Sequence, residues 1–82
     1  MSSFDFTVKD PEGIHARPAG IIVNAAKGLA GDIKITKGEK TIDAKKLFAL
    51  MGLGVKSGET ITASSEDEAS LAEFKKVLEE NL

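Results

Sequence analysis

The sequence contains no cysteine, tryptophan or tyrosine, and it has a single histidine, His15. The lack of cysteine excludes disulfides, thiolate metal ligands and a cysteine nucleophile. With one histidine, a zinc ion would need carboxylates or water for all its other ligands, and zinc sites in proteins are seldom built that way. We therefore expect neither a metal site nor a cofactor. Aromatic residues make up only 5% of the chain, all of them phenylalanine, which predicts a small aliphatic core.

An excess of charge of one sign is also missing. The chain has 11 Lys and Arg against 13 Asp and Glu, a net charge of -2. Because binding to a nucleic acid backbone depends on clustered positive charge, we expect no nucleic acid partner. No apolar run approaches the roughly 20 residues of a membrane span, so we expect no membrane insertion. Residues 1–5 lack the basic stretch and apolar block of a signal peptide, and a cytoplasmic location is the expectation.

The length of 82 residues predicts one domain over residues 1–82. Alternation of Phe4, Phe6 and Val8 with polar residues predicts a first strand. Apolar residues at helical spacing predict a helix over 18–29, with Pro18 in its first turn, where a missing amide hydrogen costs no bond.

The remaining pattern alternates short strands with helices. Ser65 and Glu68 form a capping-box pair that predicts the start of a last helix, running to Leu82. The expected order is strand, helix, strand, strand, helix, strand, helix, an α+β two-layer sandwich with helices on one face of a small sheet. The further strands are expected at 32–36, 41–43 and 60–64, and the short helix at 47–51.

His15 lies where the first strand gives way to the first helix. The free amides of Ala16 and Arg17 and the positive end of the helix dipole make such a position a ready anion site. The guanidinium of Arg17 can donate two parallel hydrogen bonds to a phosphate. A neutral imidazole is a nucleophile at neutral pH, so this group of residues predicts that His15 carries a phosphoryl group. A lone histidine at this place is also typical of a helix cap or a surface residue.

The segment Gly13-Ile14-His15-Ala16-Arg17-Pro18-Ala19 resembles the active-site motif of the HPr family, the histidine phosphocarriers of the bacterial phosphoenolpyruvate:sugar phosphotransferase system. The similarity extends over the whole chain. Residues 44–48 and 53–55, with Gly58, resemble the second helix of the family and the turn after it, and residues 66–68 resemble the start of its C-terminal helix.

This resemblance implies an open-faced β-sandwich, with a four-stranded antiparallel sheet covered on one face by three helices (βαββαβα). It implies that Enzyme I phosphorylates His15 on Nδ1, with assistance from Arg17. The group would then pass to IIA domains of sugar permeases. The chain would act as a covalent carrier, not as an enzyme, and as a monomer.

A partner interface is expected beside His15. The helix at 47–51 is too short to bury all its apolar side chains, and an exposed apolar patch beside a charged site marks an interaction surface. We expect Leu50 in the core, and Leu47 and Phe48 exposed as in the family. The full expected interface comprises Gly20, Ile21, Lys27, Lys45, Lys46, Leu47, Phe48 and Met51, with Lys27 and Lys45 as a basic rim.

Two residues depart from the family. Many members have a serine at the position of Lys46, which a regulatory kinase phosphorylates in some bacteria, and we expect this control to be absent here. Lysine is also a poor helix cap, so Asp43 or Thr41 is expected to cap the short helix instead. Gly20 occupies a place where larger residues are common, and it lowers the local helix propensity.

Two other functions remain open from the sequence. The chain could serve a regulatory relay, linked to nitrogen metabolism or to a dihydroxyacetone kinase, in place of sugar uptake. It could also be a non-catalytic module in which His15 only binds anions. A self-contained hydrolase or metalloenzyme is disfavoured, because no Ser-His-acid or multi-histidine arrangement is available.

Overall fold

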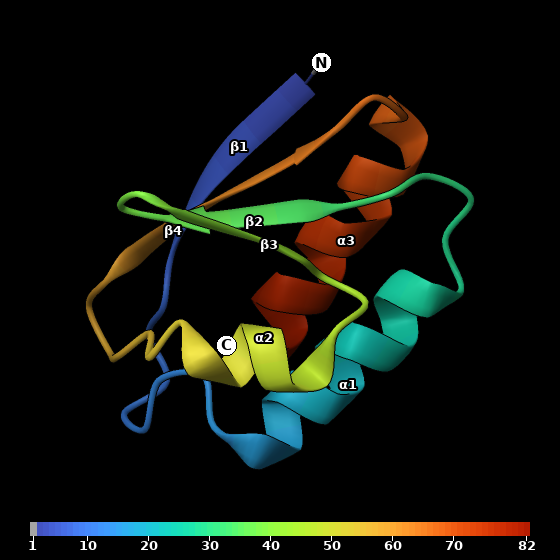
Figure 1. The fold of residues 1–82 in the computed structure, drawn as a ribbon. Coiled ribbons are helices and arrows are strands. Elements are labelled where there is room, and N and C mark those ends of the chain that lie inside the picture. The colour runs from blue at the N-terminus through green and yellow to red at the C-terminus, as the bar shows by residue number, and fades with distance from the viewer. Residues whose placement is uncertain (1) are drawn as a thin grey trace.

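The computed structural model describes residues 2–82 (Figure 1). Four strands and three helices follow in the predicted order. Their bounds are β1 (Ser2–Thr7), α1 (Ala16–Lys27), β2 (Lys34–Lys37), β3 (Lys40–Asp43), α2 (Leu47–Gly52), β4 (Thr60–Ser65) and α3 (Glu68–Asn81).

The strands form one antiparallel sheet in the order β1-β4-β2-β3. The last strand therefore lies between the first two, and β2 and β3 form a hairpin in which Lys37 faces Lys40. The three helices lie together on one side of this sheet (Figure 1). The α+β fold with an open-faced sheet is thus confirmed.

The two faces of the sheet differ as the alternating sequence predicts. On the helix side Ile35, Ile61 and Ala63 are fully buried. The opposite side carries hydroxyl groups that bond to each other across the strands, at 2.9 Å between Thr7 and Thr60 and again between Thr36 and Thr41. These polar pairs leave the second face without apolar side chains that would need a further layer.

The core lies between the sheet and the helices. Phe74 of α3 is its largest fully buried side chain, and Leu50 is the only residue of α2 that is buried completely. The helices contribute Ile22, Val23 and Ala26 from α1 and Leu71 and Leu78 from α3. The aliphatic core with few aromatic residues is confirmed.

Some predicted boundaries are wrong. The first helix begins at Ala16, two residues earlier than expected, so Pro18 is its third residue and not its first. A proline still fits there, because amides of the first turn have no intrahelical acceptor. The first strand ends at Thr7, although the amide of Val8 still donates to the carbonyl of Glu59 at 2.9 Å.

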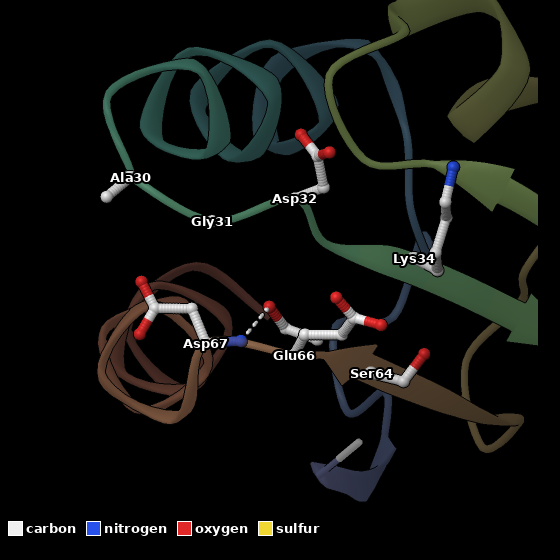
Figure 2. A pocket seen from close by; sticks show the side chains of 8 residues that line it. Ala30, Gly31, Asp32, Lys34, Ser64, Glu66 and Asp67 are labelled. Atoms are coloured by element: carbon white, nitrogen blue, oxygen red, sulfur yellow. Dashed lines mark hydrogen bonds between the residues drawn. The ribbon is translucent and has the colours of Figure 1, made fainter.

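The predicted capping box at α3 is also wrong. Asp67 is the N-cap, and its carboxylate accepts from the amide of Ala69 at 3.2 Å. The hydroxyl of Ser65 instead accepts from the amide of Asp67 at 3.1 Å (Figure 2). Glu68 accepts from the hydroxyl of Ser2 at 2.8 Å, so its carboxylate points to β1. Ser65 is the last residue of β4, so the helix begins two residues later than a cap at Ser65 would require, and Asp67 takes that place.

Within residues 2–82 no helix is long and apolar enough to cross a membrane.

Candidate functional site

Gly13 and Ile14 fix the chain just before His15. Gly13 has a φ of 69°, and a Cβ at this position would lie 2.3 Å from the carbonyl oxygen of Val55, so only glycine fits without movement. The amide of Ile14 donates to the same carbonyl at 3.0 Å, and its side chain is buried. The segment after α2 therefore holds the backbone that presents His15.

His15 is the N-cap residue of α1, with extended backbone angles. Its carbonyl accepts from the amide of Ala19 at 3.0 Å, which closes the first turn. The imidazole makes no capping hydrogen bond and its side chain is 34% exposed. It is thus accessible for chemistry, beside first-turn amides of Ala16 and Arg17 that no helical carbonyl can satisfy.

His15 and Arg17 line the same hollow, of about 290 Å³. Pro18 and Ile21 of α1 form another part of its wall, and Asn81 reaches it from the end of α3. Among residues 2–82, Arg17 forms no ion pair, so its guanidinium is available to an anion. The structure brings the predicted acceptor and the predicted phosphate-binding charge together.

Two carboxylates beside His15 were not predicted. Asp10 Oδ2 and Glu12 Oε2 each lie 3.6 Å from Nε2 of the imidazole. The residues Asp10-Pro11-Glu12-Gly13 are typical of a turn, and that composition alone indicates no contact with His15. The sequence held one indication of this contact, namely that Asp10 and Glu12 lie only five and three residues before His15. A tight turn that ends at Gly13 folds both of them back onto it.

The same three side chains are of the types that bind divalent cations. Asp10, Glu12 and His15 each offer one ligand atom, and these atoms all lie within 4.8 Å of one another. Attraction between an imidazole and two partly exposed carboxylates accounts for this approach without an ion. The expectation that the chain holds no metal stays a prediction.

Exposed apolar side chains lie on α1 and α2. Phe48 is 86% exposed, and Ile21 and Met51 are exposed as well. The two helices pack against each other, so these residues belong to neighbouring surfaces (Figure 1). Leu50 faces the core as expected, but the expected exposure of Leu47 is wrong, because its side chain is half-buried against the core.

The expected basic rim is smaller than predicted. The ammonium group of Lys45 donates to Asp32 at 2.8 Å, and this bond lowers the pKa of Asp32 and raises that of Lys45. Its charge is thus partly offset by a carboxylate. Lys27 and Lys46 are exposed. Gly20 is half-buried, and a Cβ there would meet open space, so nothing in the structure requires glycine.

Lys46 is the N-cap of α2 and makes no side-chain capping bond. Asp43 accepts from the amide of Lys45 at 2.9 Å through its carboxylate, and from the amide of Lys46 at 3.0 Å through its carbonyl. Asp43 thus stabilises the entry to α2 from just before the cap. Thr41 takes no part, because its hydroxyl is paired with that of Thr36.

A larger hollow, of about 500 Å³, lies elsewhere (Figure 2). It is formed where the segment before β2 faces the start of α3, and residues 30–32 and 64–67 line most of it. None of the predicted site residues is among them. Its size alone gives it no chemistry comparable to that around His15.

The sequence and the fold of this chain are similar to those of known proteins. The family described as the HPr component phosphorylation site of the phosphotransferase system matches residues 2–80. Phosphocarrier protein HPr of Lysinibacillus sphaericus is 41% identical over 68 residues, which cover 83% of this chain and 77% of that protein. The multiphosphoryl transfer protein of Xanthomonas campestris is 34% identical over 90% of this chain, but the chain spans only 9% of its length.

Solved structures match the fold. HPr from Thermoanaerobacter tengcongensis has a TM-score of 0.90 at 28% identity, covering 99% of this chain and 94% of that one. An HPr dimer from the same organism has a TM-score of 0.74 at 29% identity, covering 98% and 95%.

An open-faced sandwich with a histidine at the start of its first helix defines the class of small phosphocarrier domains. The chain belongs to the HPr family, the phosphocarriers of the phosphotransferase system.

Proposed function

We propose that His15 accepts a phosphoryl group on Nδ1 from Enzyme I and donates it to IIA domains of sugar permeases. In the first step the lone pair of Nδ1 forms a bond to phosphorus, and the bond from phosphorus to the donor atom breaks with its electron pair leaving on the donor. In the second step the acceptor histidine takes the phosphoryl group and the pair returns to Nδ1.

One observation carries this proposal: the uncapped imidazole of His15 and the unpaired guanidinium of Arg17 line one hollow at the start of α1. The helix dipole and the free amides favour a phosphoryl group there by a modest amount. Arg17 adds a charge that stabilises the oxygens during transfer. Because the site is open to solvent, the bound group stays reachable by the next acceptor.

The exposed patch of Ile21, Phe48 and Met51 supports docking of a protein partner next to this site. The chain then acts as a covalent substrate of its partners. We propose that it does so as a monomer, since self-association through this patch would cover the surface that a partner needs.

Incubation with Enzyme I and phosphoenolpyruvate tests the proposal. Mass spectrometry is expected to show the gain of one phosphoryl group that is lost in acid. Because the chain has one histidine, His15→Ala removes every phosphohistidine. Its imidazole makes no capping bond, so this variant is expected to keep its fold.

Lys40→Ala, an exposed change on β3 that does not line the hollow, is the control and is expected to be phosphorylated normally. Arg17→Ala is expected to fold and to be phosphorylated about tenfold or more slowly, by loss of a charge-assisted contact to the phosphoryl oxygens. A wild-type chain that stays unmodified with active Enzyme I contradicts the proposal and favours a simple anion-binding module. Transfer from Enzyme I but to no IIA domain points to a regulatory relay.

A further inference from the structure

The two carboxylates beside His15 have no place in the function proposed so far. Both approach the same ring nitrogen, Nε2, at 3.6 Å. They are held differently: Asp10 accepts from the amide of Glu12 at 2.9 Å through Oδ1, which leaves Oδ2 toward the imidazole. Glu12 reaches the ring from the same turn with its side chain 76% exposed.

Two negative charges on one side of an imidazole decide where its proton resides. In a neutral ring, one nitrogen carries hydrogen and the other carries the lone pair, and the partner of one nitrogen sets the state of the other. Carboxylates at Nε2 favour the hydrogen there, because an N–H dipole pointing at them is attracted and a lone pair is repelled. The lone pair is then on Nδ1.

We propose that Asp10 and Glu12 are positioning residues that keep a proton on Nε2 of His15 throughout the transfer cycle. The inference rests on the proposed function, with Nδ1 as the phosphoryl acceptor. Before transfer the carboxylates make Nδ1 the nucleophile. After transfer they stabilise the ring as a cation, with phosphorus on Nδ1 and hydrogen on Nε2.

The benefit lies in the second step. When the N–P bond breaks, its electron pair returns to Nδ1 and the ring leaves as neutral imidazole, with the proton still on Nε2. If Nε2 had lost its proton, the leaving group would be an imidazolate anion, which is a far poorer one. No proton has to enter or leave the ring in either step.

The other charge that lines this hollow is Arg17 of α1, and Asn81 of α3 is neutral. Arg17 and the carboxylates have separate tasks in this scheme. The guanidinium acts on the phosphoryl oxygens, and the carboxylates act on the far nitrogen of the ring. Removal of Arg17 is therefore expected to change the rate of transfer, whereas removal of the two carboxylates is expected to change which ring nitrogen carries the hydrogen.

The test uses ¹⁵N-labelled full-length protein and nuclear magnetic resonance of the ring nitrogens, which the single histidine makes unambiguous. Phosphoramidate, a small phosphoryl donor, supplies the phosphorylated form without any protein partner. The variants are Glu12→Gln, Asp10→Asn and the double variant. Asparagine keeps an oxygen for the amide of Glu12, and amide fingerprint spectra check the fold. The control is Glu39→Gln with Glu73→Gln, two exposed carboxylates that do not line the hollow.

In the wild type at alkaline pH, the unphosphorylated ring is expected almost wholly with hydrogen on Nε2, and the double variant is expected to gain the Nδ1–H form. In the phosphorylated protein, the Nε2–H signal is expected to be weaker in the double variant than in the wild type under the same alkaline conditions, because the two carboxylates that attract this hydrogen are gone. The control is expected to match the wild type.

Equal tautomer ratios and equal Nε2–H signals in the wild type and a folded double variant would overturn the inference. Since neither readout needs Enzyme I, this failure is distinct from failure of the proposed function. A wild type that shows both effects but accepts nothing from Enzyme I keeps the positioning role and loses the proposed partner.

Discussion

Gly13 determines where His15 stands although it takes no part in the chemistry. Its left-handed backbone and its contact with the carbonyl of Val55 join the turn before α1 to the segment after α2. These two segments are far apart in the chain, and His15, the proposed phosphoryl acceptor, lies two residues after Gly13. The position of the imidazole therefore depends on a backbone that tolerates no side chain at residue 13.

Gly13→Ala is expected to destabilise the fold by about 2 kcal/mol, from the strained backbone angle together with the clash. Gly38→Ala is the matched control, because Gly38 has a similar φ of 61° but nothing within 4 Å of an added Cβ. Denaturant unfolding of both variants separates the two causes. Equal losses in stability would show that the contact with Val55 contributes nothing.

Lys46 is expected to remove a possible control by phosphorylation at the entry to α2. Its side chain is exposed and makes no capping bond, and it carries no hydroxyl group. We expect a kinase that modifies serine at this place in relatives to leave this chain unmodified, as measured by mass spectrometry after incubation with ATP. Lys46→Ser is the matched variant and is expected to gain the modification. A phosphate on any serine of the wild type, with loss of transfer from Enzyme I, would contradict the prediction.

At the scale of elements, the start of α3 is tied to the segment before β2. The carboxylate of Asp67 accepts from the hydroxyl of Ser70 at 2.7 Å, and that hydroxyl in turn accepts from the amide of Gly31 at 2.9 Å. A Cβ at Gly31 would lie 2.5 Å from that of Asp67, so the two segments approach as closely as glycine permits. The cap at Asp67 thus stabilises both the start of α3 and the contact of α3 with the segment before β2.

The hydrogen bond from Ser70, followed by those from backbone amides, lowers the pKa of Asp67 below its ordinary value. The folded state therefore favours the carboxylate. Its contribution to stability is complete above the ordinary pKa of an aspartate and is lost as the pH falls through the lower folded value. Asp67→Ala is expected to lower the melting temperature by a few degrees at neutral pH and by less in acid.

Asp67→Asn separates the charge from the cap. Asparagine is as good a cap as aspartate, so the helix start is expected to survive while the dependence on pH from this residue disappears. Thermal unfolding followed by circular dichroism over the acidic range measures both variants. An unchanged slope of stability against pH in Asp67→Asn would contradict this role.

Periodicity predicted the order and type of every element, because strands and helices with one buried face leave a clear pattern in the sequence. The ends were less certain because they depend on contacts between segments. Ser65 and Glu68 have the spacing of a capping box, but the hydroxyl of Ser65 accepts from the amide of Asp67, and the carboxylate of Glu68 accepts from the hydroxyl of Ser2 on β1. Local spacing carries no information on such competition.

At the scale of the whole molecule, His15 and Arg17 could be predicted because both lie in one short motif. The exposure of Phe48 could be expected from the shortness of its helix. Leu47 was misplaced because its burial depends on how α2 tilts against the core. Asp10 and Glu12 were missed because the folding of a turn onto His15 depends on Val55, more than 40 residues away in the sequence.

The exposed patch of Ile21, Phe48 and Met51 lies on α1 and α2 beside the site. Phe48→Ala is expected to leave stability unchanged, because the side chain is 86% exposed. It is expected to raise the KM of Enzyme I for this chain by about tenfold, since an aromatic side chain at the centre of an interface contributes more than 1 kcal/mol when it is covered. Steady-state phosphorylation at varied concentrations of the chain measures this.

Leu50→Ala on the same helix is the matched control, since Leu50 is fully buried. It is expected to destabilise the fold by about 2–5 kcal/mol and to leave KM near normal where the protein stays folded. Two apolar residues of one helix, two places apart, would thus separate a docking role from a core role. A normal KM for Leu50→Ala together with lower stability would show that the assay distinguishes the two roles. A wild-type KM for Phe48→Ala would contradict the prediction and place the partner surface elsewhere.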